Sequence, residues 1–315
     1  MTARRAEQAK VSIVIPTYNR RNDLLRLLAS FAKLNYSHTR LEIIVVDNAS
    51  NLTETELRQA AGDIPLTLVA PPENLFCSGG RLFGARAARG DYLFFIDDDN
   101  VLAPDCIGHL VDAFHEDAKL GVAAPLMLFY RDKRRIWTAG VRLSALGRPI
   151  YLHSGQRTGE VTLPAKITGL DAFPNAFMVK RRVLEAVPFD VASFPHNWSE
   201  ADFGLRLKRQ GFGGATITAA RTWHDIDYDG LLTRTDRVKV YDQAKSRILF
   251  RRRFSGLAGW IVFWLVTFPV SSLVYLKAIW ASPDKHKLAM IGRYIAGTAS
   301  GIVTPLAKHV EEITL

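Results

Sequence analysis

VSIVIPTYNRRNDLLRLLASF (residues 11–31) is the stretch that decides the fold class of this chain. Its first five residues are mostly β-branched and the run stops at Pro16, which is typical of a buried strand in a parallel sheet. The leucines that follow recur at helical spacing, so they predict a helix, with Asn22 or Asp23 at its N-terminus. LEIIVV (41–46) predicts the next buried strand, and together these elements make a β-α-β unit.

The same alternation continues as far as residue 96. Residues 66–69 predict a third strand, 79–89 predict a helix that opens at a glycine pair, and 91–96 predict a fourth strand. Such alternation predicts a doubly wound α/β sheet, in which ligands bind beyond the carboxyl ends of the strands. Polar residues follow three of these strands at once: PTYN (16–19), DNAS (47–50) and DDD (97–99).

Composition sets wide limits on function. The chain has 315 residues, of which 48% are hydrophobic, so it is neither disordered nor fibrous and can hold one large domain with additions or two smaller ones. Cys77 and Cys106 form no C-x-x-C pair, which argues against a disulfide framework or a cysteine metal site and favours a reducing compartment. The net charge of +10 indicates a polyanionic partner, either nucleic acid, an anionic membrane surface or a phosphorylated substrate.

The acidic triplet at 97–99 is the strongest chemical signal. Adjacent carboxylates repel one another unless they share a cation, and hard oxygen ligands select Mg²⁺ or Mn²⁺, which keep coordination positions for substrate phosphates. The alternative is a solvated acidic turn with Asn100 as a helix cap, which the position directly after a buried strand disfavours. Asp47 and the glycine pair are each weak signals alone, because both are also ordinary turn chemistry.

Taken together, these motifs resemble the family 2 glycosyltransferases of GT-A fold, in order and spacing, over residues 11–250. The resemblance implies a Rossmann-like doubly wound sheet. It implies that the following residues hold the nucleotide-sugar: Pro16, Thr17, Tyr18, Asp47, Arg81, Asp97 and Asp98. It implies that Mn²⁺ or Mg²⁺ is held by Asp97, Asp99 and His224, with Asp99 the more direct ligand. Leu82 stands where the family usually has asparagine after the arginine.

NWSEADFGLRLKRQGF (197–212) resembles the helix start that carries the family's catalytic carboxylate. Glu200 takes the position of the usual aspartate and Ser199 that of the preceding glutamate. The resemblance therefore implies Glu200 as the general base, with Asp202 as the second choice. The alternative is that both acids only stabilise the helix N-terminus. His224 has its own alternative, since a lone histidine is more often structural.

The implied reaction is transfer of a sugar, with inversion, from a nucleotide-diphospho-sugar donor to a hydroxyl of a lipid-linked or cell-envelope glycan acceptor. Two other classes remain open. A nucleotidyltransferase normally has a glycine-rich loop after its first strand, and PTYNRRND (16–23) is no such loop. A membrane-tethered nucleotide- or carbohydrate-binding module without activity is compatible with the departures at Leu82, Ser199 and Glu200. A nucleic-acid partner is not expected, because no basic stripe with interleaved aromatics is present.

The tail predicts membrane association. Residues 254–276 carry no charge and are long enough to span a bilayer, which takes about 20 apolar residues. A second apolar stretch, 288–307, is interrupted by Arg293, so the pair predicts a hairpin, an interfacial anchor or helices packed on the catalytic domain. The triple arginine at 251–253 predicts the cytoplasmic face of the cell membrane.

Three segments follow from these patterns: a flexible N-terminus (1–10), a GT-A domain (11–250) and C-terminal membrane-associated helices (251–315).

Overall fold

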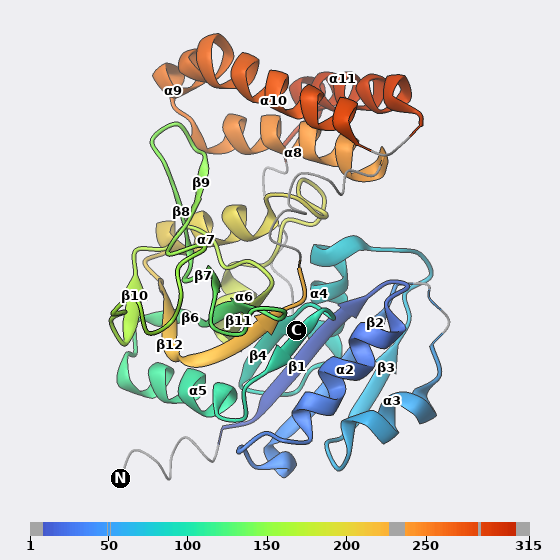
Figure 1. The fold of residues 1–315 in the computed structure, drawn as a ribbon, viewed down its shortest axis with the longest axis vertical. Helices are drawn as coiled ribbons and strands as arrows, with labels where there is room; N and C mark the ends of the chain where they lie inside the picture. The colour runs from blue at the N-terminus through green and yellow to red at the C-terminus, as the bar shows by residue number, and fades with distance from the viewer. Residues whose placement is uncertain (1–8, 49, 51, 227–236, 283–284, 307–315) are drawn as a thin grey trace.

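A mixed ten-stranded sheet forms the body of the described part of the chain, which in this computed structural model comprises residues 9–48, 50, 52–226, 237–282 and 285–306 (Figure 1). The strand order is β10-β12-β6-β11-β4-β1-β2-β3, with β5 paired to β12 and β7 to β6. The strands are β1 (Val11–Thr17), β2 (Leu41–Asp47), β3 (Leu66–Val69), β4 (Tyr92–Ile96), β5 (Asn100–Leu102), β6 (Leu120–Phe129), β7 (Ile136–Thr138), β10 (Lys166–Thr168), β11 (Ala176–Lys180) and β12 (Gly213–His224). A separate hairpin joins β8 (Val141–Leu143) to β9 (Pro149–Tyr151).

The parallel half of the sheet confirms the predicted strands. β1 pairs in parallel with β2 and with β4, and the register sets Thr17 beside Asp47 at the same edge. The acidic triplet leaves β4 at this edge too, because it directly follows Ile96. Parallel register therefore brings three segments that are distant in sequence to one side of the sheet.

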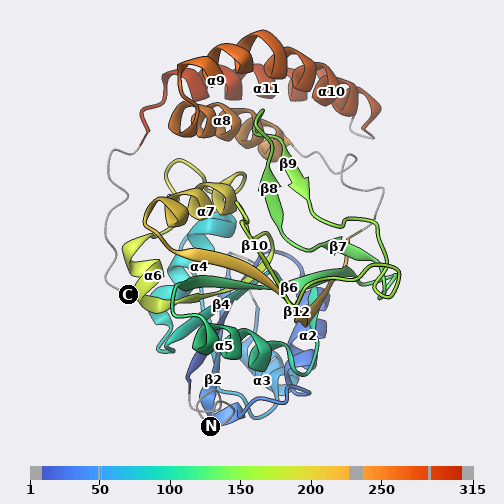
Figure 2. The same cartoon turned by 90° about the vertical axis from the view of Figure 1, so that its left-hand side faces the viewer.

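Helices cover both faces, as expected of a doubly wound sheet (Figures 1 and 2). One apolar core includes residues of α2 (Arg21–Phe31), α3 (Glu54–Ala61) and α5 (Cys106–Glu116). The core on the other face includes residues of α4 (Phe76–Ala87), α6 (Arg181–Ala186) and α7 (Ser199–Arg209). Burial of these two apolar faces is the main favourable contribution to folding.

Two predicted helix starts are wrong. α2 begins at Arg21, so neither Asn22 nor Asp23 caps it, and its capping position has no side-chain hydrogen bond. α4 begins at Phe76, so the glycine pair lies inside the helix and not at its opening. The glycines serve packing instead. A Cβ at Gly80 would lie 2.9 Å from Cβ of Pro16, so the absence of a side chain lets α4 approach the end of β1 closely.

The antiparallel half of the sheet extends the site. β11 runs antiparallel between β4 and β6. β12 runs parallel to β6, and its register shifts between Ile217 and Arg221 before it pairs His224 with Phe129. The same strand pairs His224 with Asn100, the residue after the acidic triplet. The irregular strand β12 thus places His224 at the edge of the sheet where the carboxylates of the acidic triplet lie.

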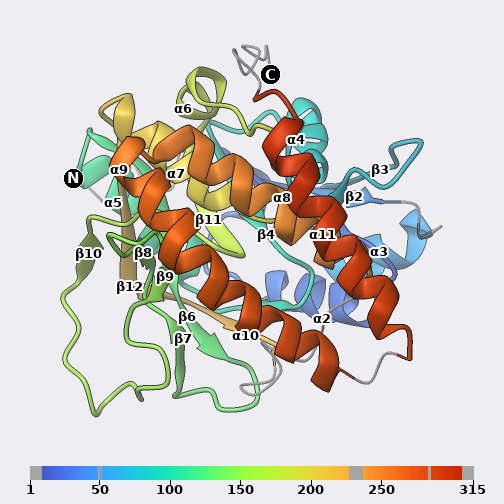
Figure 3. The same ribbon diagram turned by 90° about the horizontal axis from the view of Figure 1, so that it is seen from above.

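The C-terminal helices form a layer apart from the sheet (Figures 1 and 2), and Figure 3 shows this layer from above. This layer contains α8 (Arg237–Phe254), α9 (Leu257–Val262), a π-helical segment (Phe263–Thr267), α10 (Phe268–Ala281) and α11 (Lys287–Val303). α8 lies on the side of the layer nearer the sheet (Figure 2). α11 packs tightly on α8 at Gly297, where a Cβ would lie only 2.3 Å from the carbonyl oxygen of Tyr241. The predicted boundary at residue 250 falls within α8.

Candidate active site

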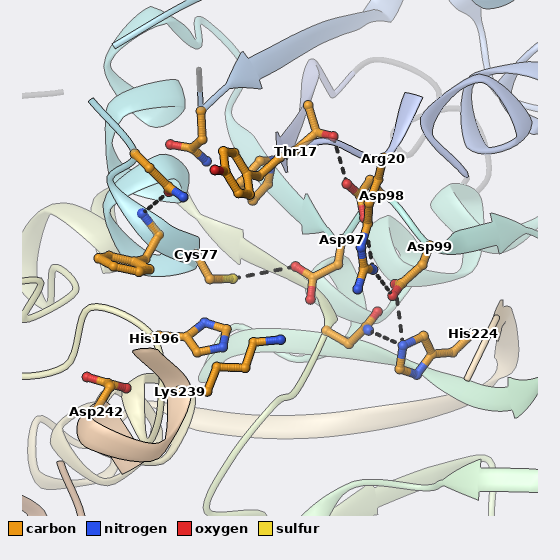
Figure 4. A pocket seen from close by; sticks show the side chains of 16 residues that line it. Thr17, Arg20, Cys77, Asp97, Asp98, Asp99, His196, His224, Lys239 and Asp242 are labelled. Carbon is orange, nitrogen blue, oxygen red and sulfur yellow. Dashed lines mark hydrogen bonds and ion pairs between the residues drawn. The ribbon is translucent and has the colours of Figure 1, made fainter. Parts of the chain in front are cut away.

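A cavity of about 860 Å³ lies at the carboxyl ends of β1, β2 and β4, between the sheet and α8 (Figure 4). Its lining residues are Pro16, Thr17, Tyr18, Arg20, Asn48, Asn74, Phe76, Cys77, Asp97, Asp98, Asp99, Asn175, His196, His224, Lys239 and Asp242. Seven residues predicted from the sequence are among them: Pro16, Thr17, Tyr18, Asp97, Asp98, Asp99 and His224. The other four predicted residues, Asp47, Arg81, Glu200 and Asp202, do not line it.

Asp98 faces β1. Its Oδ2 accepts a hydrogen bond from the Thr17 hydroxyl at 2.7 Å, and its Oδ1 lies 3.4 Å from the Arg20 guanidinium. Burial and the neighbouring charge of Asp99 raise the pKa of Asp98 to about 7, although the bond from Thr17 opposes this shift. Asp98 therefore connects the acidic turn to the end of β1.

Asp99 faces the end of β12. Its Oδ1 lies 3.3 Å from Nε2 of His224, and Arg20 contacts its other oxygen. Burial alone would raise the pKa of Asp99, but the hydrogen bonds and charges of His224 and Arg20 hold it well below its usual range. The group is an ionised carboxylate at neutral pH. Nδ1 of His224 is buried without a hydrogen-bond partner.

These side chains fit a divalent cation in their chemistry. Two carboxylates and one imidazole, from Asp97, Asp99 and His224, line the same cavity, and oxygen with nitrogen donors is a ligand set that Mn²⁺ accepts. Within the described ranges, however, no three His, Cys, Asp or Glu side chains are already grouped as a metal cluster. The carboxylates instead meet arginines: Asp99 contacts Arg20 and Asp97 contacts Arg81.

Arg81 is fully buried and bridges two acids. Its Nη2 lies 2.9 Å from Oδ1 of Asp97, and its Nη1 lies 2.6 Å from Oε1 of Glu200. The sequence predicted a nucleotide contact for Arg81, whereas the structure holds the guanidinium inside the protein, above the ring of Phe177. Arg81 thus links the acidic turn after β4 to the first turn of α7.

Glu200 is held as a carboxylate. Burial alone would raise its pKa, but the charge and hydrogen bond of Arg81 keep it below the ordinary value, and Ser199 donates a hydrogen bond to its second oxygen at 3.0 Å. The side chain keeps 19% of its surface exposed. An unprotonated, partly accessible carboxylate is able to accept a proton.

Asp202 differs from Glu200 although it is only two residues away. It is completely buried, and its two oxygens accept hydrogen bonds from Nε of Arg206 at 2.7 Å and Nη1 of Arg253 at 2.6 Å. Both arginines are charged partners, so the carboxylate is fully engaged within the protein. This geometry suits a structural acid.

Asp47 also has a local role. Its carboxylate accepts hydrogen bonds from the backbone N–H groups of Ser50 at 2.7 Å and Leu52 at 2.9 Å, and the residue is 3% exposed. The next residue, Asn48, lines the cavity and accepts a hydrogen bond from the N–H of Leu75. Asp47 therefore shapes the loop that presents Asn48.

Sequence reasoning did not identify several residues of the cavity, above all Arg20, Asn175, His196, Lys239 and Asp242. Arg20 directly follows the PTYN motif, and both this motif and the acidic turn follow strands that were predicted to end at the same edge of the sheet. A cation at that position was therefore a usable signal. Asn175 has a left-handed backbone with φ of 67°, which the sequence does not reveal. Lys239 and Asp242 are on α8, in a stretch without any motif.

The sheet order and the acidic turn at the carboxyl end of β4 define a GT-A fold. A solved structure with a similar fold is the mannosyltransferase PcManGT from Pyrobaculum calidifontis in complex with GDP-Man and Mn²⁺. It has a TM-score of 0.57 and 17% identity, over 95% of this chain and 89% of that one. The chain belongs to glycosyl transferase family 2, whose family model matches residues 12–187.

Curated relatives match shorter regions. An uncharacterized glycosyltransferase of Haemophilus influenzae is 33% identical over 95 residues, which is 30% of this chain and 31% of the relative. A dolichol-phosphate mannosyltransferase of Pyrococcus furiosus is 24% identical over 190 residues, or 59% of this chain and 50% of the relative. The chain thus covers half or less of the length of these two proteins.

Proposed function

We propose that this protein transfers a sugar from a nucleotide-diphospho-sugar to a hydroxyl group, with inversion at the anomeric carbon. The observation that carries the proposal is the pairing of a carboxylate wall, Asp97 to Asp99, with a separate ionised carboxylate, Glu200, on the other side of Arg81. Such a reaction needs one group of acids near the diphosphate and a different acid near the acceptor. Membership in glycosyl transferase family 2 supports it.

The donor occupies the end of the cavity near β1. In this proposal Pro16, Thr17 and Tyr18 contact the nucleotide, and Asp47 shapes the adjoining loop. Tyr18 supports this assignment because its side chain is 50% exposed at the cavity, available to contact a planar base. The solved relative with GDP-Man and Mn²⁺ has the same fold and agrees with a donor of this class.

In this proposal a divalent ion, Mn²⁺ or Mg²⁺, would be held by Asp97, Asp99 and His224, while Asp98 ties the acidic turn to Thr17 at the end of β1. When bound, the ion neutralises the negative charge that develops on the departing diphosphate. Arg20 contacts both Asp98 and Asp99 and so keeps the turn in place.

Glu200 accepts the proton of the acceptor hydroxyl, because it is the ionised and partly exposed acid of the pair at 200 and 202. Asp202, with both oxygens bonded to arginines, orients α7 instead. Arg81 is a positioning residue, since it sets the Glu200 carboxylate relative to Asp97. The single displacement that these roles allow inverts the anomeric centre.

The acceptor is a lipid-linked or cell-envelope glycan, and the protein acts at the cytoplasmic face of the cell membrane. In support, the segment Leu257–Ala281 is the one helix of the described residues that is long and apolar enough to cross a membrane, and only 6% of its most apolar window is buried. The Pyrococcus furiosus relative is named for a lipid phosphate, dolichol phosphate. The proposed organisation is a GT-A domain over 11–250 and membrane-associated helices over 251–315.

The test is a panel of nucleotide-sugars incubated with the full chain, a membrane extract as acceptor and either Mn²⁺ or EDTA. We expect one donor to raise the thermal midpoint in the presence of Mn²⁺, and the same donor to be consumed, with a product of inverted anomeric configuration by NMR. Binding without turnover would support the non-catalytic binding module instead. If added pyrophosphate converted the nucleotide-sugar to a nucleoside triphosphate and a sugar 1-phosphate, the result would support a nucleotidyltransferase. Retained configuration would overturn the single-displacement mechanism.

A further inference from the structure

The outer face of the segment formed by α9, the π-helical turn and α10 is apolar along most of its length. The large exposed side chains of this segment include Leu257, Ile261, Leu265, Leu273 and Trp280. The first three recur every fourth residue, and Leu265 and Leu273 are 75% and 62% exposed. They therefore form one continuous apolar stripe on one side of the layer.

The inner face of the same segment is packed on its neighbours through both apolar contacts and hydrogen bonds. Ile279, Tyr275 and Leu276 of α10 belong to an apolar cluster with residues of α8 and α11. Arg247 of α8 donates a hydrogen bond to the Ser271 hydroxyl at 2.6 Å and another to the Tyr294 hydroxyl at 2.6 Å. Ser272 shares a hydrogen bond with the same Tyr294 hydroxyl at 2.7 Å. This polar seam ties α10 to both α8 and α11.

α8 is in turn bound to the catalytic domain. Asp242 accepts hydrogen bonds from the backbone and side chain of Asn197 at 3.0 and 2.6 Å, and Arg253 contacts Asp190 and Asp202. If α10 crossed the bilayer with this packing intact, the guanidinium of Arg247 and the charged α8 would enter hydrocarbon, which is strongly unfavourable. The packing is compatible with a helix that lies along the membrane surface.

The charge of the layer complements an anionic lipid surface. From residue 243 to 306 the sequence contains nine basic residues and one acidic residue, Asp284. Lys277, Lys285 and Arg293 are exposed within this layer. Basic side chains around an apolar face are typical of helices that bind the interface of anionic membranes.

We propose that α9, α10 and α11 lie flat in one leaflet of an anionic bilayer and do not cross it. The apolar stripe lies among the acyl chains and α8 lies at headgroup depth, with the cavity directly beneath it. The inference rests on the proposed membrane contact but not on sugar transfer. If both hold, the wall of the cavity formed by Lys239 and Asp242 is one helix away from the headgroups.

Single cysteines at the two ends of the apolar segment test the topography. Ser255→Cys and Lys285→Cys are labelled with a membrane-impermeant maleimide in intact spheroplasts and in inverted vesicles, and the parent chain with Cys77 and Cys106 gives the background. We expect both new cysteines to be labelled in inverted vesicles and neither in spheroplasts. Labelling of the Lys285→Cys variant in spheroplasts would show that the segment spans, which overturns the inference and leaves membrane contact intact.

Vesicle binding tests the apolar stripe and the charge separately. We expect the full chain to bind vesicles containing phosphatidylglycerol at least ~10-fold more tightly than pure phosphatidylcholine, and Leu265→Glu to weaken binding ~10-fold or more. Gln59→Glu on α3, which adds the same charge on an exposed site far from the layer, is the matched control and should bind normally. Equal binding by Leu265→Glu and Gln59→Glu would overturn the inference.

Sugar transfer is measured in parallel on a detergent-dispersed acceptor, where Leu265→Glu should retain the parent rate. Loss of vesicle binding with normal transfer supports the flat anchor. Absence of transfer by the parent chain, with normal vesicle binding and labelling, contradicts the proposed function alone.

Discussion

The two ends of the cavity are built by different means. At the end near β1, where we propose that the donor binds (the donor end), Thr17, Asp98 and Asp99 lie at or just beyond the ends of parallel strands, and the backbone register of the sheet brings them together. At the end near Glu200, where we propose that the acceptor binds (the acceptor end), the loop before α7 is held by Asp242 and Arg253 of α8.

The acceptor end also contains backbone strain. Trp198 precedes α7 with φ of 65°, a left-handed conformation that is unusual for a bulky residue. Its ring lies 4.6 Å from that of Phe250 on α8, so the helix helps to hold the strained residue. The difference teaches that the donor end is fixed by the sheet, whereas the position of Glu200 depends on a few long-range contacts.

The largest expected effect is at the donor end. Asp99→Ala removes the ionised carboxylate beside His224, and we expect transfer to fall about 10³-fold or more because charge on the leaving diphosphate is no longer neutralised. Stabilisation by donor with Mn²⁺, measured by thermal shift, should disappear as well. Some loss in the free energy of unfolding is also expected, because the carboxylate contacts Arg20 and His224, so chemical denaturation is measured in parallel. Near-parental turnover would remove Asp99 from the proposed metal site.

At the acceptor end, Glu200→Gln keeps the size of the side chain but removes the base. We expect kcat to fall about 10² to 10⁴-fold, the range found for general bases, with donor affinity unchanged. Stopped-assay kinetics with donor titration separate the two effects. Glu116→Gln, an exposed glutamate on α5, is the matched control. A normal kcat for the Glu200→Gln variant would show that Glu200 is not the general base.

Arg253→Met tests whether α8 holds the acceptor end. The substitution leaves Asp190 and Asp202 buried without this cation, and the loss of one partner from a buried ion pair costs about 3–5 kcal/mol in the free energy of unfolding. Chemical denaturation measures this change. We also expect KM for the acceptor to rise while KM for the donor changes little, and an equal rise in both would argue against separate ends.

The smallest expected effect is at the rim of the donor end. Tyr18→Ala removes an exposed ring that is proposed to contact the nucleotide base, and the loss of one stacking contact, about 1–3 kcal/mol, should weaken donor binding about 10-fold. Isothermal titration with donor and Mn²⁺ measures it. The free energy of unfolding should not change, and Tyr18→Phe should restore binding. An unchanged Kd for the donor would show that the nucleotide base binds elsewhere.

Much of the fold was predictable. The strands over 11–17 and 41–47 match the apolar runs in the sequence, because a strand buried on both faces needs a continuous run of such residues. The strand over 66–69 was predicted as well, although it lies at the edge of the sheet and is only partly buried. The helix starts at Arg21 and Phe76 were not predictable in the same way. The residues at their capping positions, Arg20 and Leu75, make no side-chain capping hydrogen bond, so the usual polar signal is missing at those positions.

The candidate site also has a part that was predictable from the sequence and a part that was not. Seven predicted residues line the cavity, and they lie at or just beyond the ends of β1, β4 and β12. Arg81 and Glu200, which are 119 positions apart, meet only after α4 and α7 have packed on one face of the sheet. Glu200 and Asp202 look alike in sequence, and only the structure distinguishes them: Glu200 is partly exposed and contacts one arginine, whereas Asp202 is buried between two.

The sequence by itself determined the parallel half of the sheet, the acidic turn at its edge and the apolar tail. Hydrophobic period sets strands and helices locally, and parallel pairing then brings the carboxyl ends of strands to one edge. Only the tertiary structure decided that Asp202 is buried while Glu200 stays partly exposed, that Arg81 joins Asp97 to Glu200, and that α8 forms a wall of the cavity. Those features depend on side-chain contacts between segments far apart in the chain, which no local pattern encodes.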